Sequence, residues 1–442
     1  MLKGPVNMLR TLLVTVFCWP AFAQPAPDLK DILARLDRLE HENRTLRDEV
    51  RQLRQDLVST RAAPQERQEI QDRRLDEQAQ TKVEASQKFP LRVTGMALFN
   101  AFYGGVNSGN DVPTTASASP GGVVSGATLR QSILGLEFHG PSTFLGGKVR
   151  GSLFADFFDG FTEQGATYAQ LRTATVEIEW KTRSLMAGLE KPIFNPRNPT
   201  SLAQVGYSPM TGSGNLWRWQ PQIRFEQRFD AGERGGLRAQ LGVLQTSEES
   251  GYGTLPATFT GRIERRRPGL EGRFEFFARW DNERRIEIAP GFHFSTSRVG
   301  GQSVPSRLFS LDWFANPWQR LEFSGAFFNG QNVAHFGALR QGFRVLADGK
   351  AVPVHAIGGW AQLSLIATNR LTFNLFGGQH DDKNYDLYGT GVAQNRVGAA
   401  NLMFRLAPNV IVGFEGMRYR TTHLGIGNRF NTRYDLAIAY LF

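Results

Sequence analysis

The chain ends in a strict alternation of apolar and polar side chains. One face of this segment carries Tyr434, Leu436, Ile438, Tyr440 and Phe442, and the other carries Asn431, Arg433, Asp435, Ala437 and Ala439. A period of two predicts a β-strand, and aromatic residues toward the ends of its apolar face are typical of a strand that faces lipid. The alternative is an amphipathic strand on the core of a soluble protein. The aromatic pair Tyr440 and Phe442 also resembles the signal for assembly into the outer membrane.

Similar alternating runs recur along the chain, and we expect about sixteen antiparallel strands. The candidate runs are 91–103, 128–139, 148–158, 172–180, 185–190, 217–229, 237–245, 267–278, 285–295, 307–314, 321–329, 360–366, 371–377, 397–406, 410–419 and 429–442. An even number of strands suits a single-chain bacterial barrel, and a barrel of this size leaves an aqueous channel. The predicted fold is therefore an all-β transmembrane barrel with an N-terminal helical coiled coil.

Hydropathy is consistent with this fold and excludes a helical membrane protein. Beyond the N-terminus no stretch approaches the roughly 18 consecutive apolar residues of a spanning helix, and the mean hydropathy is -0.32. Strands that alternate lipid-facing and lumen-facing residues average to such a value. The 47 Gly and 33 Phe residues fit tight turns and an aromatic exterior, although several soluble β-sandwich domains would share part of this composition.

The N-terminus predicts a secretory signal peptide over residues 1–23. Lys3 and Arg10 form a basic region, an apolar run follows from Leu12 to Trp19, and Ala21-Phe22-Ala23 is a cleavage site of small residues. The only cysteine, Cys18, lies inside this signal. We therefore expect a mature chain without disulfides or cysteine metal sites.

Residues 24–60 predict a periplasmic coiled coil. Leu29, Ile32, Leu36, Leu39, Leu46, Val50, Leu53 and Leu57 form a heptad seam, with Asn43 at one a position, where a buried Asn fixes the register. The g-to-e pairs Arg35 with Glu40, Glu42 with Arg47, and Glu49 with Arg54 are all opposite in charge. This pattern favours parallel self-association over a single solvated helix but does not decide between two and three strands. Residues 61–89 predict a polar linker or stalk, and residues 90–442 the barrel.

Alternation also assigns arginines to the lumen of the barrel. These are Arg150, Arg218, Arg224, Arg238, Arg273, Arg285 and Arg433, each with polar neighbours two residues away or an apolar neighbour on the opposite face. Residues 91–442 contain 36 basic residues, of which 31 are Arg, and 27 acidic ones, an excess of nine. Arg favours bidentate contact with carboxylate or phosphate. The alternative is that these arginines brace the wall by pairing with Asp156, Glu271, Glu275 and Asp435.

The segment from Lys191 to Leu216 predicts a constriction loop that folds into the channel. No Asp or Glu occurs between Glu190 and Glu226, whereas Lys191, Arg197, Arg218 and Arg224 do. An acid-free constriction beside basic side chains sets up a positive potential that concentrates anions. Tyr207, Trp217 and Trp219 offer aromatic contact to a ring-bearing solute, although Trp217 and Trp219 fall on the lipid-facing parity.

The chain resembles the DcaP-like trimeric porins. The likeness rests on the coiled coil before a barrel, on the closing strand, and on the segments 146–151 (GGKVRG), 155–158 (ADFF), 371–374 (LTFN) and 401–402 (NL). It covers nearly the whole mature chain. The resemblance implies a trimer with one channel per subunit, through which small anionic and often dicarboxylic nutrients diffuse.

The expected function is passive diffusion of small carboxylates across the bacterial outer membrane. We expect no cofactor, metal or nucleic acid, and as partners a homotrimer through the coiled coil and the barrel walls, membrane lipid and lipopolysaccharide, and the barrel-assembly machinery. One alternative is a barrel enzyme, but none of the seven histidines stands beside a serine in a pattern that suggests a nucleophile and base. The segment His380-Asp381-Asp382 indicates a solvated acidic loop more than a cation site. A second alternative is a structural tether or adhesin.

Overall fold

The computed structural model describes residues 30, 34–35, 37–53, 90–109, 116–158, 168–245, 264–265, 268–299, 301–339, 341–389 and 391–442. They belong to two compact units, 1–85 and 86–442. Among the described residues no helix is long and apolar enough to cross a membrane. The predicted signal peptide and the linker at 61–89 lie outside the described residues.

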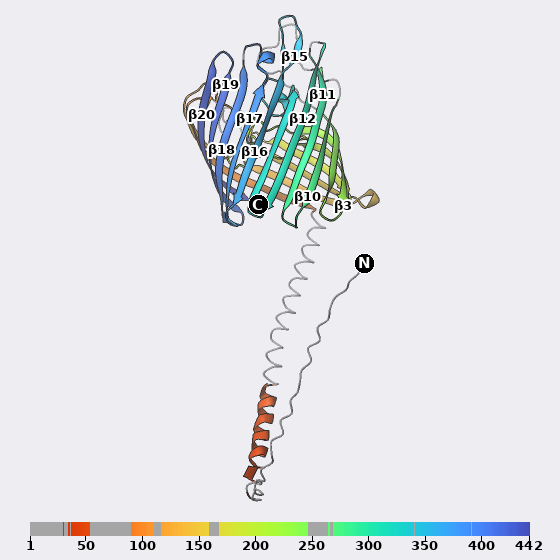
Figure 1. Cartoon of the computed structure of the whole chain (residues 1–442), viewed down its shortest axis with the longest axis vertical. Coiled ribbons are helices and arrows are strands. Elements are labelled where there is room, and N and C mark those ends of the chain that lie inside the picture. Colours follow the sequence, from red (N-terminus) through yellow and green to blue (C-terminus); the bar gives the residue numbers. More distant parts are fainter. Residues whose placement is uncertain are drawn as a thin grey trace, which may run out of the picture. The chain divides into compact units, whose positions relative to one another are not determined.

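In the described part of unit 86–442, sixteen antiparallel strands form a closed barrel (Figure 1). They are β1 (Leu91–Gly104), β3 (Ile133–Ser142), β4 (Lys148–Asp156), β5 (Gln170–Glu179), β6 (Arg183–Glu190), β7 (Gln220–Ala231), β8 (Gly235–Leu244), β10 (Gly269–Arg279), β11 (Arg285–Val299), β12 (Gln302–Trp318), β13 (Leu321–Gln331), β16 (His355–Ile366), β17 (Leu371–Asp382), β18 (Val392–Ala407), β19 (Val410–His423) and β20 (Gly427–Leu441). Short additions are β2 (Val124–Thr128), β9 (Glu264–Arg265), the pair β14 (Phe343–Val345) and β15 (Ala351–Pro353), and the 3-10 turns η1 (Phe144–Gly146), η2 (Ala334–Phe336) and η3 (Asn384–Leu387).

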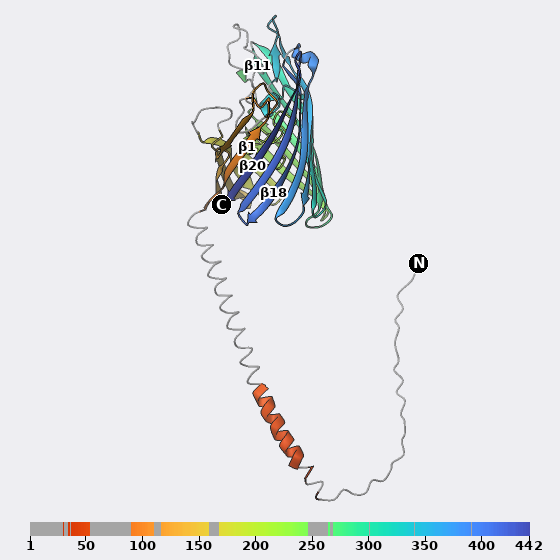
Figure 2. The ribbon, with the colours of Figure 1, turned by 90° about the vertical axis from the view of Figure 1, so that its left-hand side faces the viewer.

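Each strand pairs with the next along the barrel, and the first and last strands close it. β1 pairs with β20 over nine positions from Met96↔Leu441 to Gly104↔Arg433, and the two strands lie side by side in Figure 2. The backbone N–H of Gly95 donates to the carbonyl oxygen of Phe442 at 2.9 Å. Closure leaves no unpaired edge, which is what a β structure within a bilayer requires.

The alternation of the sequence places apolar side chains outside and polar ones inside. On β20, Tyr434, Leu436, Ile438 and Tyr440 are exposed on the outer face, whereas Arg433 and Asp435 are buried on the inner face. Exposed outer side chains alternate with buried inner ones in the same way along much of β11, β12 and β18. This arrangement suits lipid outside and a polar lumen inside.

All sixteen predicted strands occur, and most extend beyond the predicted runs. β12, for example, covers Gln302–Trp318, where alternation predicted only 307–314. One boundary is wrong in a way that matters for the lumen, because β7 begins at Gln220 and not at residue 217.

The two ends of the barrel differ in their connections. At one end, called the turn end, strands are joined by short segments such as 367–370 and 408–409; at the other, the loop end, by long ones such as 332–354, which holds η2, β14 and β15 (Figure 1). The long segment between β6 and β7, residues 191–219, is called the inner loop below.

In unit 1–85 the described residues include a helix over residues 37–53. Its seam residues Leu39, Leu46, Val50 and Leu53 are 48% to 65% exposed in the single chain, and Asn43 is exposed as well. The helix is therefore confirmed over this range, and its apolar seam has no covering partner within the described part of this chain. Self-association stays a prediction.

Candidate functional site

The inner loop lies inside the barrel, because its contacts are with inward-facing side chains of the wall. Near its start the backbone N–H of Ile193 donates to Glu271 Oε2 on β10 at 2.7 Å. The hydroxyl of Ser310 on β12 donates to the carbonyl oxygen of Phe194 at 3.1 Å. These contacts fix the first part of the loop to the β10–β12 wall.

The middle of the inner loop is fixed to the opposite wall. Asn401 of β18 donates to the carbonyl oxygen of Thr200 at 2.8 Å, and Asn100 of β1 donates to that of Leu202 at 2.8 Å. Buried Gln131 donates to the carbonyl oxygen of Ala203 at 2.9 Å. The loop therefore crosses the lumen, as the sequence predicted for a constriction loop.

The last part of the inner loop returns along β16 and β17. Asn395 of β18 donates to Ser213 Oγ at 2.6 Å. Gly214 has φ +108°, and a Cβ atom there would lie 2.2 Å from the carbonyl oxygen of Gly359. Only glycine allows this backbone conformation together with so close an approach. The loop is thus packed directly against bare backbone of the wall.

Asp312 is the centre of an ion-pair cluster beneath the inner loop. Arg273 of β10 binds it with two hydrogen bonds, of 2.7 Å from Nε and 2.8 Å from Nη2. Arg197 of the inner loop donates from Nε to the same carboxylate at 3.1 Å. Arg273 is 2% exposed and Asp312 fully buried. One carboxylate therefore holds both the wall and the loop.

Glu275 and Glu287 complete this cluster. Glu287 pairs with Arg197 and accepts from Arg285 Nε at 2.6 Å. Glu275 pairs with Arg238 and with Arg273, whose Nη2 lies 2.7 Å from it. The four arginines were all predicted to face the lumen, and they do, but each is ion-paired.

Ion pairs also hold predicted lumenal arginines elsewhere. Arg433 lies 2.9 Å from Asp435 on β20, both buried, and Arg150 lies 3.0 Å from Glu179 near the turn end, where both are about half exposed. Arg238, Arg273 and Arg433 therefore pair with acids that the bracing alternative named. Arg150 and Arg285 are paired with other acids, and Arg197, which that alternative did not include, is paired as well.

The bracing acids differ in part from those expected. Glu271 does not brace an arginine in the described residues; it accepts from Ile193 and contacts His293. Asp312 and Glu287 were missed, although Asp312 lies on the polar parity of β12 beside Ser310, a signal that alternation could have used. Asp156 pairs with Arg172 at 2.5 Å, and Arg172 was also missed.

Lys191, Arg218 and Arg224 are the remaining predicted basic residues of this region. Arg224 is half-buried on the inner face of β7, and its Nε has no hydrogen-bond partner within the described part of the chain. Burial lowers the pKa of Lys191. Arg218 lies ahead of β7, where its backbone N–H donates to the carbonyl oxygen of Phe336 at 3.2 Å. No salt bridge is formed by Lys191 or Arg224 among the described residues.

Trp217 and Trp219 do not face lipid, so the alternation that assigned them to the lipid-facing side of a strand is wrong at these two positions. They precede β7, which begins at Gln220, and strand alternation therefore does not apply to them. Trp217 is 5% exposed and contacts Tyr207 at 5.7 Å and Trp219 at 4.9 Å between ring centroids. The guanidinium of Arg172 lies 4.8 Å from the Trp219 ring centroid. These rings form an aromatic cluster inside the barrel.

Two histidine groups also differ from expectation. His380 and Asp382 belong to β17, are buried and lie 2.8 Å apart, so they are not in a solvated loop. Among the described residues no group of three His, Cys, Asp or Glu could hold a metal ion.

His293 contacts Ser295 Oγ through Nε2 at 2.8 Å and Glu271 through Nδ1 at 3.0 Å. This serine–histidine–carboxylate chain was not predicted from the sequence, because only a serine beside a histidine was considered there. His293 and Ser295 are two residues apart and lie on the same face of β11.

No family model and no curated protein sequence matches the chain. Among solved structures, the outer membrane channel DcaP of Acinetobacter baumannii is similar with a TM-score of 0.64 and 14% identity, over 80% of this chain and 97% of that chain. An anion-selective porin from Comamonas acidovorans is similar with a TM-score of 0.54 and 13% identity, over 80% of this chain and 99% of that one. The chain has the porin barrel fold. The predicted resemblance to the DcaP-like porins is confirmed at the level of this fold.

Proposed function

We propose that this chain is an outer-membrane porin that lets small solutes diffuse passively and prefers small anions such as carboxylates. The observation that carries the proposal is a sixteen-stranded barrel crossed by an inner loop that has no acidic residue, with Lys191, Arg218 and Arg224 in or beside it. The cluster around Asp312 joins four arginines to three carboxylates and so carries one net positive charge. This charge, together with Lys191 and Arg224, is the proposed source of the positive potential. Fixed charges at a constriction select by sign without a tight binding site.

Reversal potentials across a planar bilayer under a salt gradient test this selectivity. Arg218→Glu combined with Arg224→Glu should move the reversal potential toward cation preference. The shift should shrink at 1 M salt, where the screening length is about 3 Å. Arg307→Glu on the outer face of β12 is the matched control and should leave the potential unchanged. A cation-selective wild type would contradict the proposal.

The proposed assembly is a homotrimer in the bacterial outer membrane, held by barrel walls and by a parallel coiled coil in the periplasm. The exposed seam of the helix over 37–53 and the opposite g-to-e charges support it. Tyr440 and Phe442, about half exposed at the end of the barrel, are proposed as the signal for the assembly machinery. Lipopolysaccharide and lipid would surround the outer face.

A barrel enzyme is the second candidate, and the chain Ser295–His293–Glu271 is the observation that favours it. The two hydrogen bonds lie within the range of a nucleophile with its base and orienting group. Against it, His293 is fully buried, with the Phe336 ring 4.7 Å away, and Ser295 is only 8% exposed. Hydrolysis of small acyl esters by the purified protein, abolished in Ser295→Ala, would support the enzyme; rapid swelling of liposomes in both proteins without hydrolysis supports the porin.

A further inference from the structure

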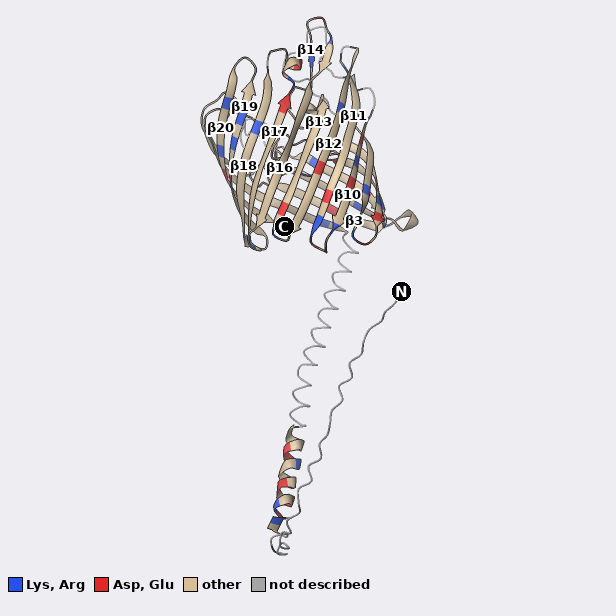
Figure 3. Ribbon diagram, viewed as in Figure 1, with Lys and Arg blue, Asp and Glu red and all other residues tan. Residues whose placement is uncertain are grey.

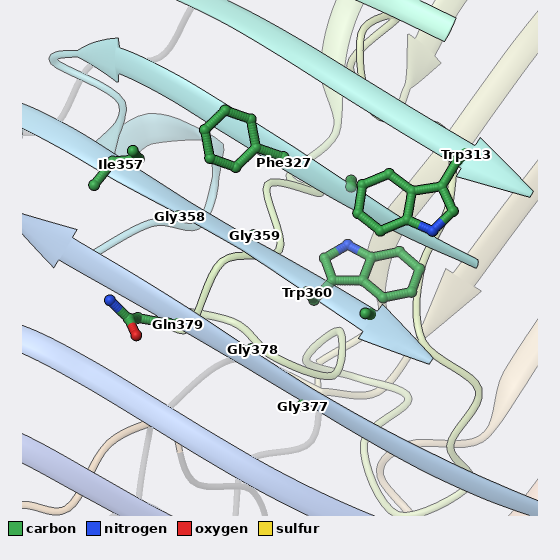
Figure 4. A pocket seen from close by; sticks show the side chains of 11 residues that line it. Trp313, Phe327, Ile357, Gly358, Gly359, Trp360, Gly377, Gly378 and Gln379 are labelled. Carbon is green, nitrogen blue, oxygen red and sulfur yellow. The ribbon is translucent and has the colours of Figure 1, made fainter. Parts of the chain in front are cut away.

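The outer face of the barrel has an apolar hollow across β13, β16 and β17. It measures about 490 Å³, within the range of ligand pockets. Gly359 and Gly377 occupy outward positions of β16 and β17 and leave the backbone bare, while Trp313, Phe327 and Ile357 stand around it (Figure 4). The floor of the hollow therefore includes backbone that no side chain covers at the two glycines.

Three arginines point outward beside this hollow. Arg396 of β18 is paired in register with Arg420 of β19, Arg418 lies two residues along β19, and all three are exposed. Figure 3 shows Lys and Arg gathered on the upper part of this wall, toward the loop end. Within the described part of the chain none of the three forms an ion pair. The neighbouring carboxylate, Asp381, accepts instead from Gln379 at 3.3 Å and from Gln394 at 2.5 Å.

Such an arrangement is unfavourable for the chain alone. Like charges directly opposite on neighbouring strands destabilise a sheet. An arginine on the lipid face is costly at the bilayer midplane and costs much less near the interface. Arg396, Arg418 and Arg420 lie in the half of their strands nearer the loop end, where headgroups replace acyl chains. An anion that bridges two or three guanidinium groups would relieve their repulsion, and phosphate matches the guanidinium fork.

The hollow and the arginines are adjacent. Gln379, which lines the hollow, is the register partner of Arg396. Gly377 is the partner of Gly398, and Gly398 is the partner of Arg418. A Cβ atom at Gly398 would meet nothing within 4 Å, so the surface between the hollow and the arginines is open. One amphipathic molecule can reach both.

We propose that this surface binds a phosphate-bearing lipid of the outer leaflet, with an acyl chain in the hollow and phosphate on Arg396, Arg418 and Arg420. Free phosphate would use the arginines and leave the hollow empty, whereas a lipid uses both. The proposal rests on the proposed outer-membrane location and is independent of the solute that passes through the lumen. Channel activity in a bilayer therefore tests the proposed function separately from this site.

Native mass spectrometry of the full-length protein in detergent, titrated with bis-phosphorylated lipid A, tests the site. The triple variant Arg396→Gln, Arg418→Gln, Arg420→Gln should bind lipid A at least tenfold more weakly than wild type. Gly398→Leu keeps every charge but occupies the open surface, and it should weaken lipid binding to a similar extent. Arg307→Gln, which removes an outward arginine elsewhere on the barrel, is the matched control and should change the affinity less than twofold. Folding of each variant is checked by its heat-dependent mobility in gels.

Three results would overturn the proposal. Lipid A bound equally by the triple variant and wild type would show that the arginines do not hold it. Displacement of lipid A by millimolar inorganic phosphate, with no effect of Gly398→Leu, would indicate a free-anion site. A triple variant that is folded but loses its oligomeric mass would show that the surface is a contact between subunits.

Discussion

Replacement of Asp312 by Asn tests the ion-pair cluster, because this single carboxylate binds both Arg273 and Arg197. Asn keeps the shape but loses the charge, and its amide N–H groups would face guanidinium donors that now sit at 2.7, 2.8 and 3.1 Å from the carboxylate. Breaking a buried ion pair by removing one partner costs about 3–5 kcal/mol. Because Asn retains one acceptor, we expect the free energy of unfolding to fall by about 3 kcal/mol.

Urea titration of the refolded protein in detergent micelles, followed by tryptophan fluorescence, measures this loss. The matched control is Asp230→Asn, which removes a carboxylate from a half-exposed pair with Arg228 at 2.7 Å. Exposed pairs contribute about 0–1 kcal/mol, so this variant should stay within that range. Asp312→Asn should also shift the reversal potential toward anions, since it removes one negative charge from the lumen. A loss no larger than that of the control would refute the bracing role of Asp312.

Three further predictions follow from other parts of the chain. Tyr440→Ser with Phe442→Ser should sharply reduce the amount of protein in the outer membrane, measured by fractionation; normal abundance would remove the support for the assembly signal. Asn43→Leu should change the oligomeric state or register of the isolated helix, measured by light scattering and crosslinking, while the barrel still folds; a helix that stays monomeric at high concentration would contradict the coiled coil. Gly214→Ala should displace the inner loop and alter single-channel conductance, whereas Gly212→Ala, also at positive φ but with no atom closer than 3.6 Å, should alter it much less; equal effects would show that backbone strain and not the close approach matters.

The strands could be predicted from the sequence because each residue in a barrel wall has only two environments. Lipid outside and polar lumen inside impose a period of two, which located all sixteen strands and placed Arg224, Arg273 and Arg433 on the inner face. The same rule misplaced Trp217 and Trp219, because alternation was extended past the start of β7 into the inner loop. Where the backbone leaves the sheet, parity carries no information.

The partners of the lumenal charges could not be predicted in the same way. Parity states which face a residue is on but not which residues across the lumen it meets, so Arg197 was taken as a free positive charge of an acid-free loop. In the structure the acids come from other strands, far along the chain, as Asp312 and Glu287 do. The absence of acid in a segment therefore does not make the segment's surroundings positive.

This distinction decides where selectivity can arise in the barrel. A paired arginine such as Arg273 stiffens the barrel wall but adds little to the electrostatic potential of the lumen, because a carboxylate within hydrogen-bond distance balances its charge. The excess of nine basic residues in 91–442 must then act through groups without such balance. In the described part of the chain these include Arg224 and Lys191 inside, and Arg396, Arg418 and Arg420 outside. Charges outside face lipid and affect permeating ions much less than lumenal charges do, so any preference for anions has to come from charges inside the barrel.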